Sequence, residues 1–203
     1  MKNGWILSLT SLGLSFSAIA SSPSPSYNCN KAQDSIDKLI CQSDELSQLD
    51  KQLQPLYSQA IKQLSHHDAQ TLTAQQRGWI KGRNECWKAE DKTECTRASY
   101  QTRITELQIS AGSIEVPSPT YYVCDNEPAF QLSVYFYNNT LLPAAVFSYS
   151  SAQQPPSDPA LGFVTRTGSG AKYQAQNATL WTHQQEATLT FFEQPPIICQ
   201  IQK

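Results

Sequence analysis

A serine set between two glycines is the part of the chain whose residue types most suggest chemistry. Ser169 stands between Gly168 and Gly170, and glycines let a partner approach a hydroxyl closely. His183 lies in the same half of the chain, and a serine with a histidine can form the nucleophile and base of a hydrolase. The flanking sequence lacks the Gly-x-Ser-x-Gly pattern and the strand–turn–helix setting of a nucleophile elbow. We therefore expect the protein not to be an enzyme.

Cysteines are the second set of reactive residues, and they are Cys29, Cys41, Cys86, Cys95, Cys124 and Cys199. An even number of cysteines with few histidines favours disulfides over metal binding. The spacing contains no paired Cys-x-x-Cys motif of the kind found in zinc sites, and the adjacent His66 and His67 have no evident third ligand. The sequence therefore predicts disulfides, and neither a metal site nor another cofactor.

The N-terminus resembles an export signal. Lys2 supplies a positive charge, residues 5–16 are mostly apolar, and small residues precede a cleavage site after Ala20. The apolar run is too short and too rich in serine for a membrane span, and the alternative is a buried N-terminal helix. Because no cysteine directly follows the run, we expect no lipid anchor in the membrane. Residues 1–20 thus predict a periplasmic protein in an oxidising compartment, where disulfides persist.

Charge and composition exclude several function classes. The chain has 15 Lys and Arg against 17 Asp and Glu, for a net charge of −2, whereas a nucleic-acid-binding protein would show a basic excess. Hydrophobic residues make up 39% of the chain, which is enough for folded cores. The imbalance of charge is concentrated in residues 113–203, whose net charge is −3.

The hydrophobic periodicity changes from helical to alternating along the chain, which predicts two domains. After the signal, residues 21–26 form a Ser/Pro leader that we expect to be disordered, and residues 110–118 have the composition of a linker. We expect a small disulfide-stapled helical domain over residues 27–109. An antiparallel eight-stranded barrel or flattened barrel is expected over residues 119–203, so that the fold class is α+β in two domains.

Apolar residues at steps of three and four predict the main helix of the first domain: Leu46, Leu49, Leu53, Leu56, Tyr57, Ala60, Ile61 and Leu64. Ser43 is placed to cap it, and a shorter helix precedes it around Ile40. Thr73 and Asp91 are expected to begin two further helices, with Gln76 and Glu94 as their capping partners. The pair His66 and His67 is then expected in a loop exposed to solvent.

Four cysteines lie at the ends of these helices and allow three disulfide pairings. In an antiparallel helical hairpin, the start of one helix lies near the end of the next. This arrangement favours Cys41–Cys86, which leaves Cys29–Cys95. A small core of this kind gains most of its rigidity from such staples.

Eight short runs with alternating or β-branched character predict the strands of the second domain: residues 120–124, 130–137, 141–149, 161–166, 171–175, 179–183, 187–192 and 197–201. Asn138-Asn139 is expected to form a tight hairpin turn. Cys124 lies in the first of these strands and Cys199 in the last, so a disulfide between them would join the two ends of the barrel.

The first domain resembles the LprI N-terminal-like domain of secreted bacterial proteins over about residues 27–109. The resemblance rests on Cys29, Ile40-Cys41, Leu49-Asp50, Tyr57, Leu72, Gln75-Gln76-Arg77-Gly78-Trp79, Arg83, Cys86, Cys95, Tyr100, Arg103-Ile104 and Leu107. One branch of that family is associated with lysozyme inhibition, but the resemblance implies no particular partner for this domain. We expect Trp79 and Trp87 to pack in its core.

The second domain resembles the C-type lysozyme inhibitor family, which includes the membrane-bound form MliC and its periplasmic relative PliC, over about residues 119–203. The resemblance rests on Tyr122-x-Cys124, Phe130, Val134-x-Phe136, Ser169-Gly170-x-x-Tyr173, Leu180-Trp181-Thr182-His183, Glu186-Ala187 and Cys199. It implies inhibition of c-type lysozyme, a basic enzyme with two catalytic carboxylates in a cleft. An acidic domain would be drawn to such an enzyme by long-range attraction.

The same resemblance implies roles for individual residues. Ser169 would contact one lysozyme carboxylate, helped by the close approach that Gly170 allows, while Tyr173 would brace the loop. His183 stands where the family has lysine, so Lys172 is an alternative source of positive charge. Because a histidine gains charge as the pH falls through the physiological range, we expect inhibition to tighten toward pH 6.

A carbohydrate- or peptidoglycan-binding module without inhibitory activity is the alternative function. Exposed aromatic residues can stack on sugars, and the candidates are Tyr121, Tyr122, Tyr135, Tyr137, Tyr149 and Trp181. Aromatic residues on strands are more often part of a core, which is what we expect of Trp181.

Overall fold

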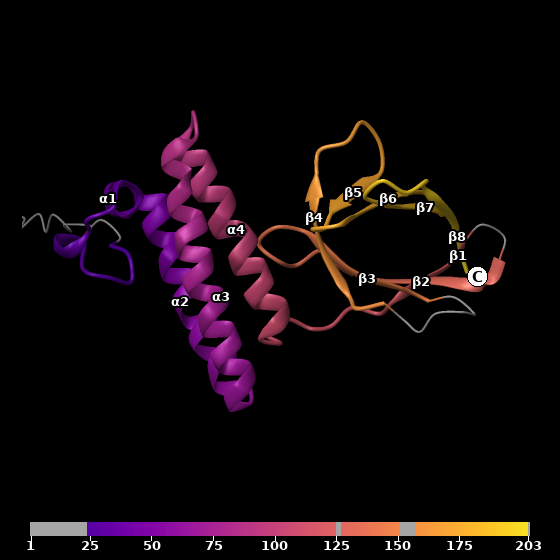
Figure 1. The fold of residues 1–203 in the computed structure, drawn as a ribbon, viewed down its shortest axis with the longest axis horizontal. Helices are drawn as coiled ribbons and strands as arrows, with labels where there is room; N and C mark the ends of the chain where they lie inside the picture. The colour runs from indigo at the N-terminus through magenta and orange to yellow at the C-terminus, as the bar shows by residue number, and fades with distance from the viewer. Residues whose placement is uncertain (1–23, 125–126, 151–156, 203) are drawn as a thin grey trace, which may run out of the picture.

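The computed structural model describes residues 24–124, 127–150 and 157–202. These residues form a helical half followed by a barrel of eight strands (Figure 1). The helical half consists of η1 (Cys29–Lys31), α1 (Ser35–Gln42), α2 (Asp44–Gln63), α3 (His66–Asn84), η2 (Glu85–Lys88) and α4 (Lys92–Ser110). The barrel consists of β1 (Thr120–Cys124), β2 (Glu127–Tyr137), β3 (Ala144–Ser150), β4 (Ala160–Thr165), β5 (Ala171–Gln174), β6 (Ala178–His183), β7 (Glu186–Phe191) and β8 (Ile197–Ile201). The predicted α+β fold class is confirmed.

The N-terminal ends of α2 and α4 are those that the sequence predicted. The Ser43 hydroxyl accepts a hydrogen bond from the backbone N–H of Leu46, and the Asp91 carboxylate accepts one from that of Glu94. Each bond satisfies a donor that the first turn of a helix otherwise leaves unpaired. The expected short helix before Ser43 is α1.

The predicted start of α3 at Thr73 is wrong, because the helix begins seven residues earlier at His66. The Ser65 hydroxyl caps it by accepting from the backbone N–H of Asp68. Thr73 lies within the helix, where its hydroxyl donates to the carbonyl of Ala69. His66 and His67 are exposed, as expected, but in the first turn of α3 and not in a loop.

The three long helices α2, α3 and α4 lie side by side, and α1 packs at one end of them (Figure 1). Their core is built from Ile36, Ile40, Leu46, Leu49, Leu53, Leu72, Tyr100, Ile104 and Leu107. Trp79 packs against this core as expected, with its ring 5.3 Å from that of Tyr100. Trp87 does not, because it lies in η2, after α3, and is 52% exposed.

The predicted disulfide pairing in the helical half is wrong. Cys29 bonds to Cys41, and Cys86 bonds to Cys95. Both bridges close short stretches, because each pair brackets a change of chain direction: η1 turns into α1, and η2 turns into α4. The prediction assumed that each disulfide joins two separate helices of a hairpin, whereas each one joins segments that are close together in the sequence.

The leader is ordered where the structure describes it, so the expectation of disorder is wrong for residues 24–26. Pro25 is buried, and Ser26 donates from its backbone N–H and its hydroxyl to the carboxylate of Asp50 on α2. The expected signal of residues 1–20 lies outside the described residues.

The eight strands form a closed antiparallel barrel in which each strand pairs with the next along the chain. β8 returns to β1, where Cys124 pairs with Cys199 in register and forms the predicted disulfide. Side chains that fill the interior include Leu132, Val134, Phe147, Tyr173, Leu180 and Leu189. Closure removes the unpaired sheet edges that an open sheet would expose.

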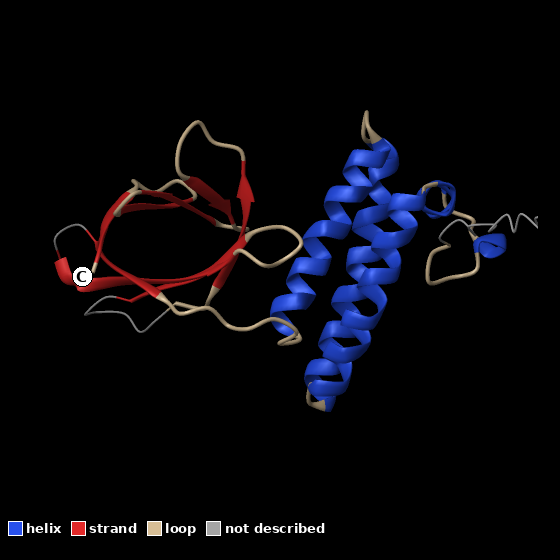
Figure 2. Cartoon of the chain, turned by 180° about the vertical axis from the view of Figure 1, so that it is seen from behind, coloured by secondary structure: helices blue, strands red, loops and turns tan. Residues whose placement is uncertain are grey.

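The connection between β2 and β3 is not the tight Asn138-Asn139 turn that the sequence predicted. It spans residues 138–143, and its conformation is fixed by the Thr140 hydroxyl, which donates to the carbonyls of Tyr137 and Leu142. The longer loop reaches α4 of the helical half, as Figure 2 shows. No helix in the described part of the chain is long and apolar enough to cross a membrane.

Candidate functional site

The loop between β4 and β5, residues 166–170, carries Ser169 on an exposed turn. Gly170 has a φ of +67°, a backbone conformation that glycine adopts without strain. A Cβ added at Gly170 would lie 2.2 Å from the carbonyl oxygen of Thr182 on β6. The loop therefore lies directly against β6, and only a glycine fits at the point of contact.

The carbonyl of Ser169 is held by two hydrogen bonds. The indole N–H of Trp181 donates to it at 2.9 Å, and the hydroxyl of Thr167 donates at 3.1 Å. Among the described residues, the Ser169 hydroxyl itself has no hydrogen-bond partner, and the residue is exposed. The backbone of Ser169 is thus fixed while its side chain remains available to donate.

Trp181 does not lie in the barrel core, contrary to the prediction. Along β6, Ala178 and Leu180 are buried, so Thr179, Trp181 and His183 face outward. Trp181 is half-buried and lines a shallow groove with Thr167, Lys172 and Thr188. Successive side chains of a strand point to opposite faces, and Trp181 directly follows Leu180, which points into the barrel. This alternation is the sequence signal that would have placed Trp181 on the outer face of the barrel.

His183 lies beside the loop, at the end of β6. Its ring is parallel to that of Trp181, with the ring centroids 5.6 Å apart. Its Cβ lies 3.2 Å from where a side chain at Gly170 would begin. Across the β6–β7 hairpin, it pairs in register with Glu186. The structure therefore brings His183 beside the loop that carries Ser169 and Gly170, from which it is separated in the sequence.

Lys172 and Tyr173 follow the loop on β5 and face opposite sides of the barrel wall. Lys172 pairs in register with Trp181 and lines the same outer groove. Tyr173 is buried, and its ring packs 5.6 Å from that of Phe136. Burial raises the pKa of the Tyr173 hydroxyl, which is therefore neutral at physiological pH. Tyr173 supports the strand from inside, whereas Lys172 is available on the surface.

The residues that define the first domain's motif converge on a different place, a buried polar network between the helices. The Tyr100 hydroxyl donates to the Asp50 carboxylate at 2.8 Å and accepts from the Arg83 guanidinium at 2.8 Å. Arg83 also pairs with Asp37 on α1, and its guanidinium lies 5.5 Å from the ring centroids of both Trp79 and Tyr100. This network joins all four helices and the leader, so its role is to hold the helical half together.

No group of three or more metal-ligating side chains occurs in the part of the chain that the structure describes. The site around Ser169 contains a hydroxyl, an imidazole and an ammonium group, and Glu186 pairs in backbone register with His183. Such a set can donate hydrogen bonds and present positive charge to an acidic partner.

Two family models match the two halves of the chain. The model described as "Lysozyme inhibitor LprI" matches residues 29–115, and the model described as "Membrane-bound lysozyme-inhibitor of c-type lysozyme" matches residues 122–197. Both resemblances inferred from the sequence are therefore confirmed.

Relatives named "Lipoprotein LprI" from Mycobacterium bovis and Mycobacterium tuberculosis are 32% identical to this chain over 166 residues. The matched region covers 82% of this chain and 79% of each relative, so it includes both halves. No solved structure matches the chain.

Proposed function

Because this chain belongs to the LprI family of lysozyme inhibitors, we propose that it blocks c-type lysozyme by inserting the loop around Ser169 into the enzyme's active-site cleft. The cleft of such an enzyme contains two carboxylates that flank the scissile bond. A protein that fills it must supply hydrogen-bond donors and positive charge on a rigid support. The proposed role is protection of peptidoglycan from cleavage.

The exposed and unpartnered hydroxyl of Ser169 is the observation that carries this proposal. Its backbone is fixed by Trp181 and Thr167, so little conformational freedom remains to be lost on binding. A hydroxyl that donates to a carboxylate forms a charge-assisted hydrogen bond, which contributes roughly 1.5–3 kcal/mol. We assign Ser169 to one carboxylate of the cleft.

Positive charge for the second carboxylate can come from two residues near the loop. His183 touches the loop at Gly170, whereas Lys172 lies on the adjoining outer groove. Because His183 occupies the position of the family's lysine, we assign it the contact.

Replacement of Ser169 tests the proposal directly. We expect Ser169→Ala to weaken inhibition of c-type lysozyme by about 10- to 100-fold, which corresponds to the loss of one charge-assisted hydrogen bond. The measurement is the inhibition constant from clearing of a bacterial cell-wall suspension. Ser110→Ala, at the exposed end of α4, is the matched control and should inhibit like the unmodified protein. Equal inhibition by the two variants would contradict the assigned role of Ser169.

We also propose that the chain is exported to the periplasm, where lysozyme would be encountered. Support comes from the disulfides, which include all six cysteines and which persist in oxidising compartments. The bond between Cys29 and Cys41 supports the expectation that Cys29 carries no lipid. Mass spectrometry of the protein purified from an envelope extract would test cleavage after Ala20.

A further inference from the structure

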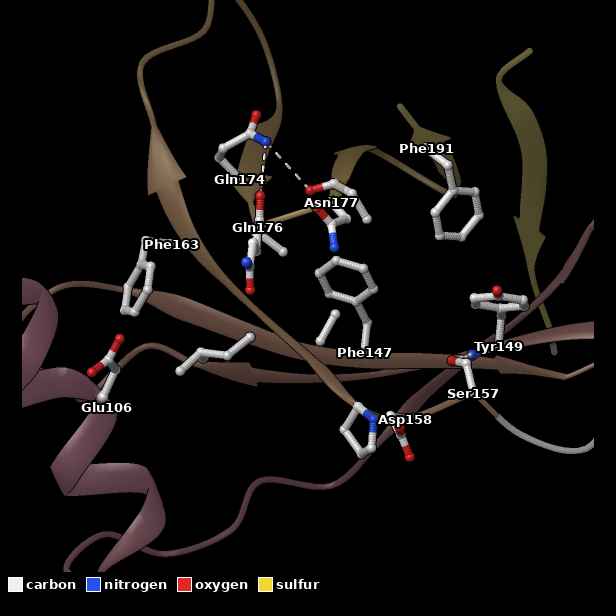
Figure 3. Close-up of a pocket in the computed structure, with 15 residues that line it drawn as sticks. Glu106, Phe147, Tyr149, Ser157, Asp158, Phe163, Gln174, Gln176, Asn177 and Phe191 are labelled. Carbon is white, nitrogen blue, oxygen red and sulfur yellow. Dashed lines mark hydrogen bonds between the residues drawn. The ribbon is translucent and has the colours of Figure 1, made fainter. Parts of the chain in front are cut away.

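A cavity lies at the junction of the two halves, away from Ser169. It has a volume of about 700 Å³ and is bounded by α4, β3, β4 and the β5–β6 turn (Figure 3). The Ser169 loop precedes β5, whereas this turn follows it, so the two features lie at opposite ends of that strand. The volume is within the range of small-molecule binding sites.

Two side-chain amides enter the cavity from the β5–β6 turn. Gln176 and Asn177 occupy the centre of the turn, which is closed by the hydrogen bond from the N–H of Ala175 to the carbonyl of Ala178. In Figure 3 the Asn177 side chain points toward the ring of Phe147. Neither amide has a hydrogen-bond partner among the described residues. Each therefore presents both a donor and an acceptor to whatever enters the cavity.

Aromatic rings supply the apolar part of the lining. Phe147 lies below the two amides, Phe163 lies toward α4, and Tyr149 and Phe191 lie at the other end, where their rings are 5.0 Å apart (Figure 3). Rings in this arrangement offer faces and edges for the C–H groups of a flat, amphipathic ligand.

The charges around the cavity restrict its ligand further. Glu106 and Asp158 line it, and its described lining includes no Lys, Arg or His. Glu106 is paired with Arg103 on α4 at 2.8 Å, which leaves Asp158 as the exposed carboxylate. An anionic ligand would meet repulsion without a compensating cation. The lining instead suits a neutral ligand that carries hydroxyl and amide groups.

We propose that this cavity binds a neutral acetamido sugar. The acetamido group has one N–H and one carbonyl, which match the acceptor and donor of a side-chain amide such as that of Asn177. The sugar ring would pack on the aromatic lining, and its hydroxyls would donate to Asp158 and Gln176. This site is separate from the surface assigned to lysozyme and would bind its ligand in the absence of the enzyme.

Calorimetric titration of the full-length purified protein with tri-N-acetylchitotriose tests the proposal. We expect saturable binding that Gln176→Ala and Asn177→Ala each weaken by about 3- to 10-fold, as expected for one lost hydrogen bond. Ser169→Ala should bind the sugar unchanged. Thermal unfolding of each variant establishes that it is folded, since both positions are exposed.

Three outcomes would overturn the proposal. The first is the absence of saturable binding at millimolar sugar, and the second is binding that neither substitution weakens. The third is binding of the de-N-acetylated, cationic chitotriose with no binding of the neutral form, which would assign the cavity to amines instead. Loss of lysozyme inhibition by Ser169→Ala together with an absence of sugar binding would leave the proposed inhibitor function intact and refute this site alone.

Discussion

At the scale of single residues, the conformation of Gly170 determines whether the proposed inhibitory loop can form. We expect Gly170→Ala to destabilise the protein by about 1–3 kcal/mol and to weaken inhibition strongly, because the positive φ and the contact with Thr182 both disfavour a Cβ. Inhibition constants and urea unfolding measure the two effects. Gly168→Ala is the matched control, since a Cβ there meets nothing within 4 Å. If both variants behave alike, the loop does not depend on its contact with β6.

The proposed contact between His183 and lysozyme predicts that inhibition depends on pH. We expect the dissociation constant for c-type lysozyme to be lower at pH 6 than at pH 8, because protonation adds a positive charge opposite an acidic cleft. His183→Gln, which retains hydrogen-bonding capacity without the charge, should show a flatter profile. Calorimetry reports binding without interference from the pH dependence of lysozyme activity. Equal affinity of the unmodified protein at both pH values would remove His183 from the proposed contact.

The sequence allowed the residue types of the candidate site to be predicted, but not the contacts that hold those residues in place. The glycine-flanked serine and the histidine were identified from local motifs. The bracing role expected of Tyr173 stays a prediction, and the structure shows its ring buried inside the barrel. The role of Trp181 was missed, because core packing is the commonest place for a tryptophan on a strand. Its hydrogen bond to Ser169 depends on how β5 and β6 pair, which no local pattern specifies.

At the scale of the elements, Tyr100 on α4 connects the helices through its hydroxyl. Burial, in the first place, raises its pKa far above the usual value for tyrosine. A group whose pKa is higher in the folded protein than in the unfolded chain stabilises the fold fully at any pH below its pKa in the unfolded chain. For a tyrosine that value is about 10, and the stabilisation is lost as the pH rises above it. We therefore expect the free energy of unfolding to decrease above about pH 10.

Tyr100→Phe separates this effect from general alkaline instability. The variant should lose about 2–4 kcal/mol at pH 7, because Asp50 and Arg83 each lose a buried partner. Its stability should then fall less steeply than that of the unmodified protein between pH 10 and pH 11. Urea unfolding at each pH gives both quantities, and Tyr121→Phe, at an exposed position on β1, is the control. If the stability of Tyr100→Phe and that of the unmodified protein fall equally with pH, the alkaline loss of stability does not come from Tyr100.

Most elements could be predicted because their signals are local. Alternating residues gave all eight strands to within a few residues, and capping residues gave the starts of α2 and α4. The start of α3 was missed because Ser65 is followed by polar residues, so the hydrophobic periodicity begins only after the first turns. The disulfide pairing was missed because it depends on which turns bring cysteines together, and three pairings were compatible with the sequence.

At the scale of the whole molecule, α4 holds the barrel through the loop between β2 and β3. The Thr105 hydroxyl accepts from the N–H of Leu142 at 3.0 Å, and the Gln108 side chain accepts from that of Leu141 at 2.9 Å. Thr105 is fully buried, although α4 belongs to the helical half. The two halves are therefore joined by specific hydrogen bonds in addition to the chain between them.

Thr105→Val tests whether these bonds fix the arrangement of the halves. The substitution keeps the shape and removes the acceptor, so we expect a loss of about 1–3 kcal/mol and a broader distribution of distances between the halves. Small-angle X-ray scattering measures that distribution, and Thr102→Val, elsewhere on α4, is the control. Lysozyme inhibition should be retained, since the Ser169 loop does not contact α4. A scattering profile identical to that of the unmodified protein would show that these bonds do not restrain the halves.

The disulfide between Cys124 and Cys199 affects what happens to the barrel when a protease cleaves it. It links the first strand of the barrel to the last, so almost every loop of the barrel lies between its two ends. A protease that nicks one of these loops once would leave two fragments that remain covalently attached and still paired along their strands. The two fragments would separate only after a reductant cleaved the disulfide.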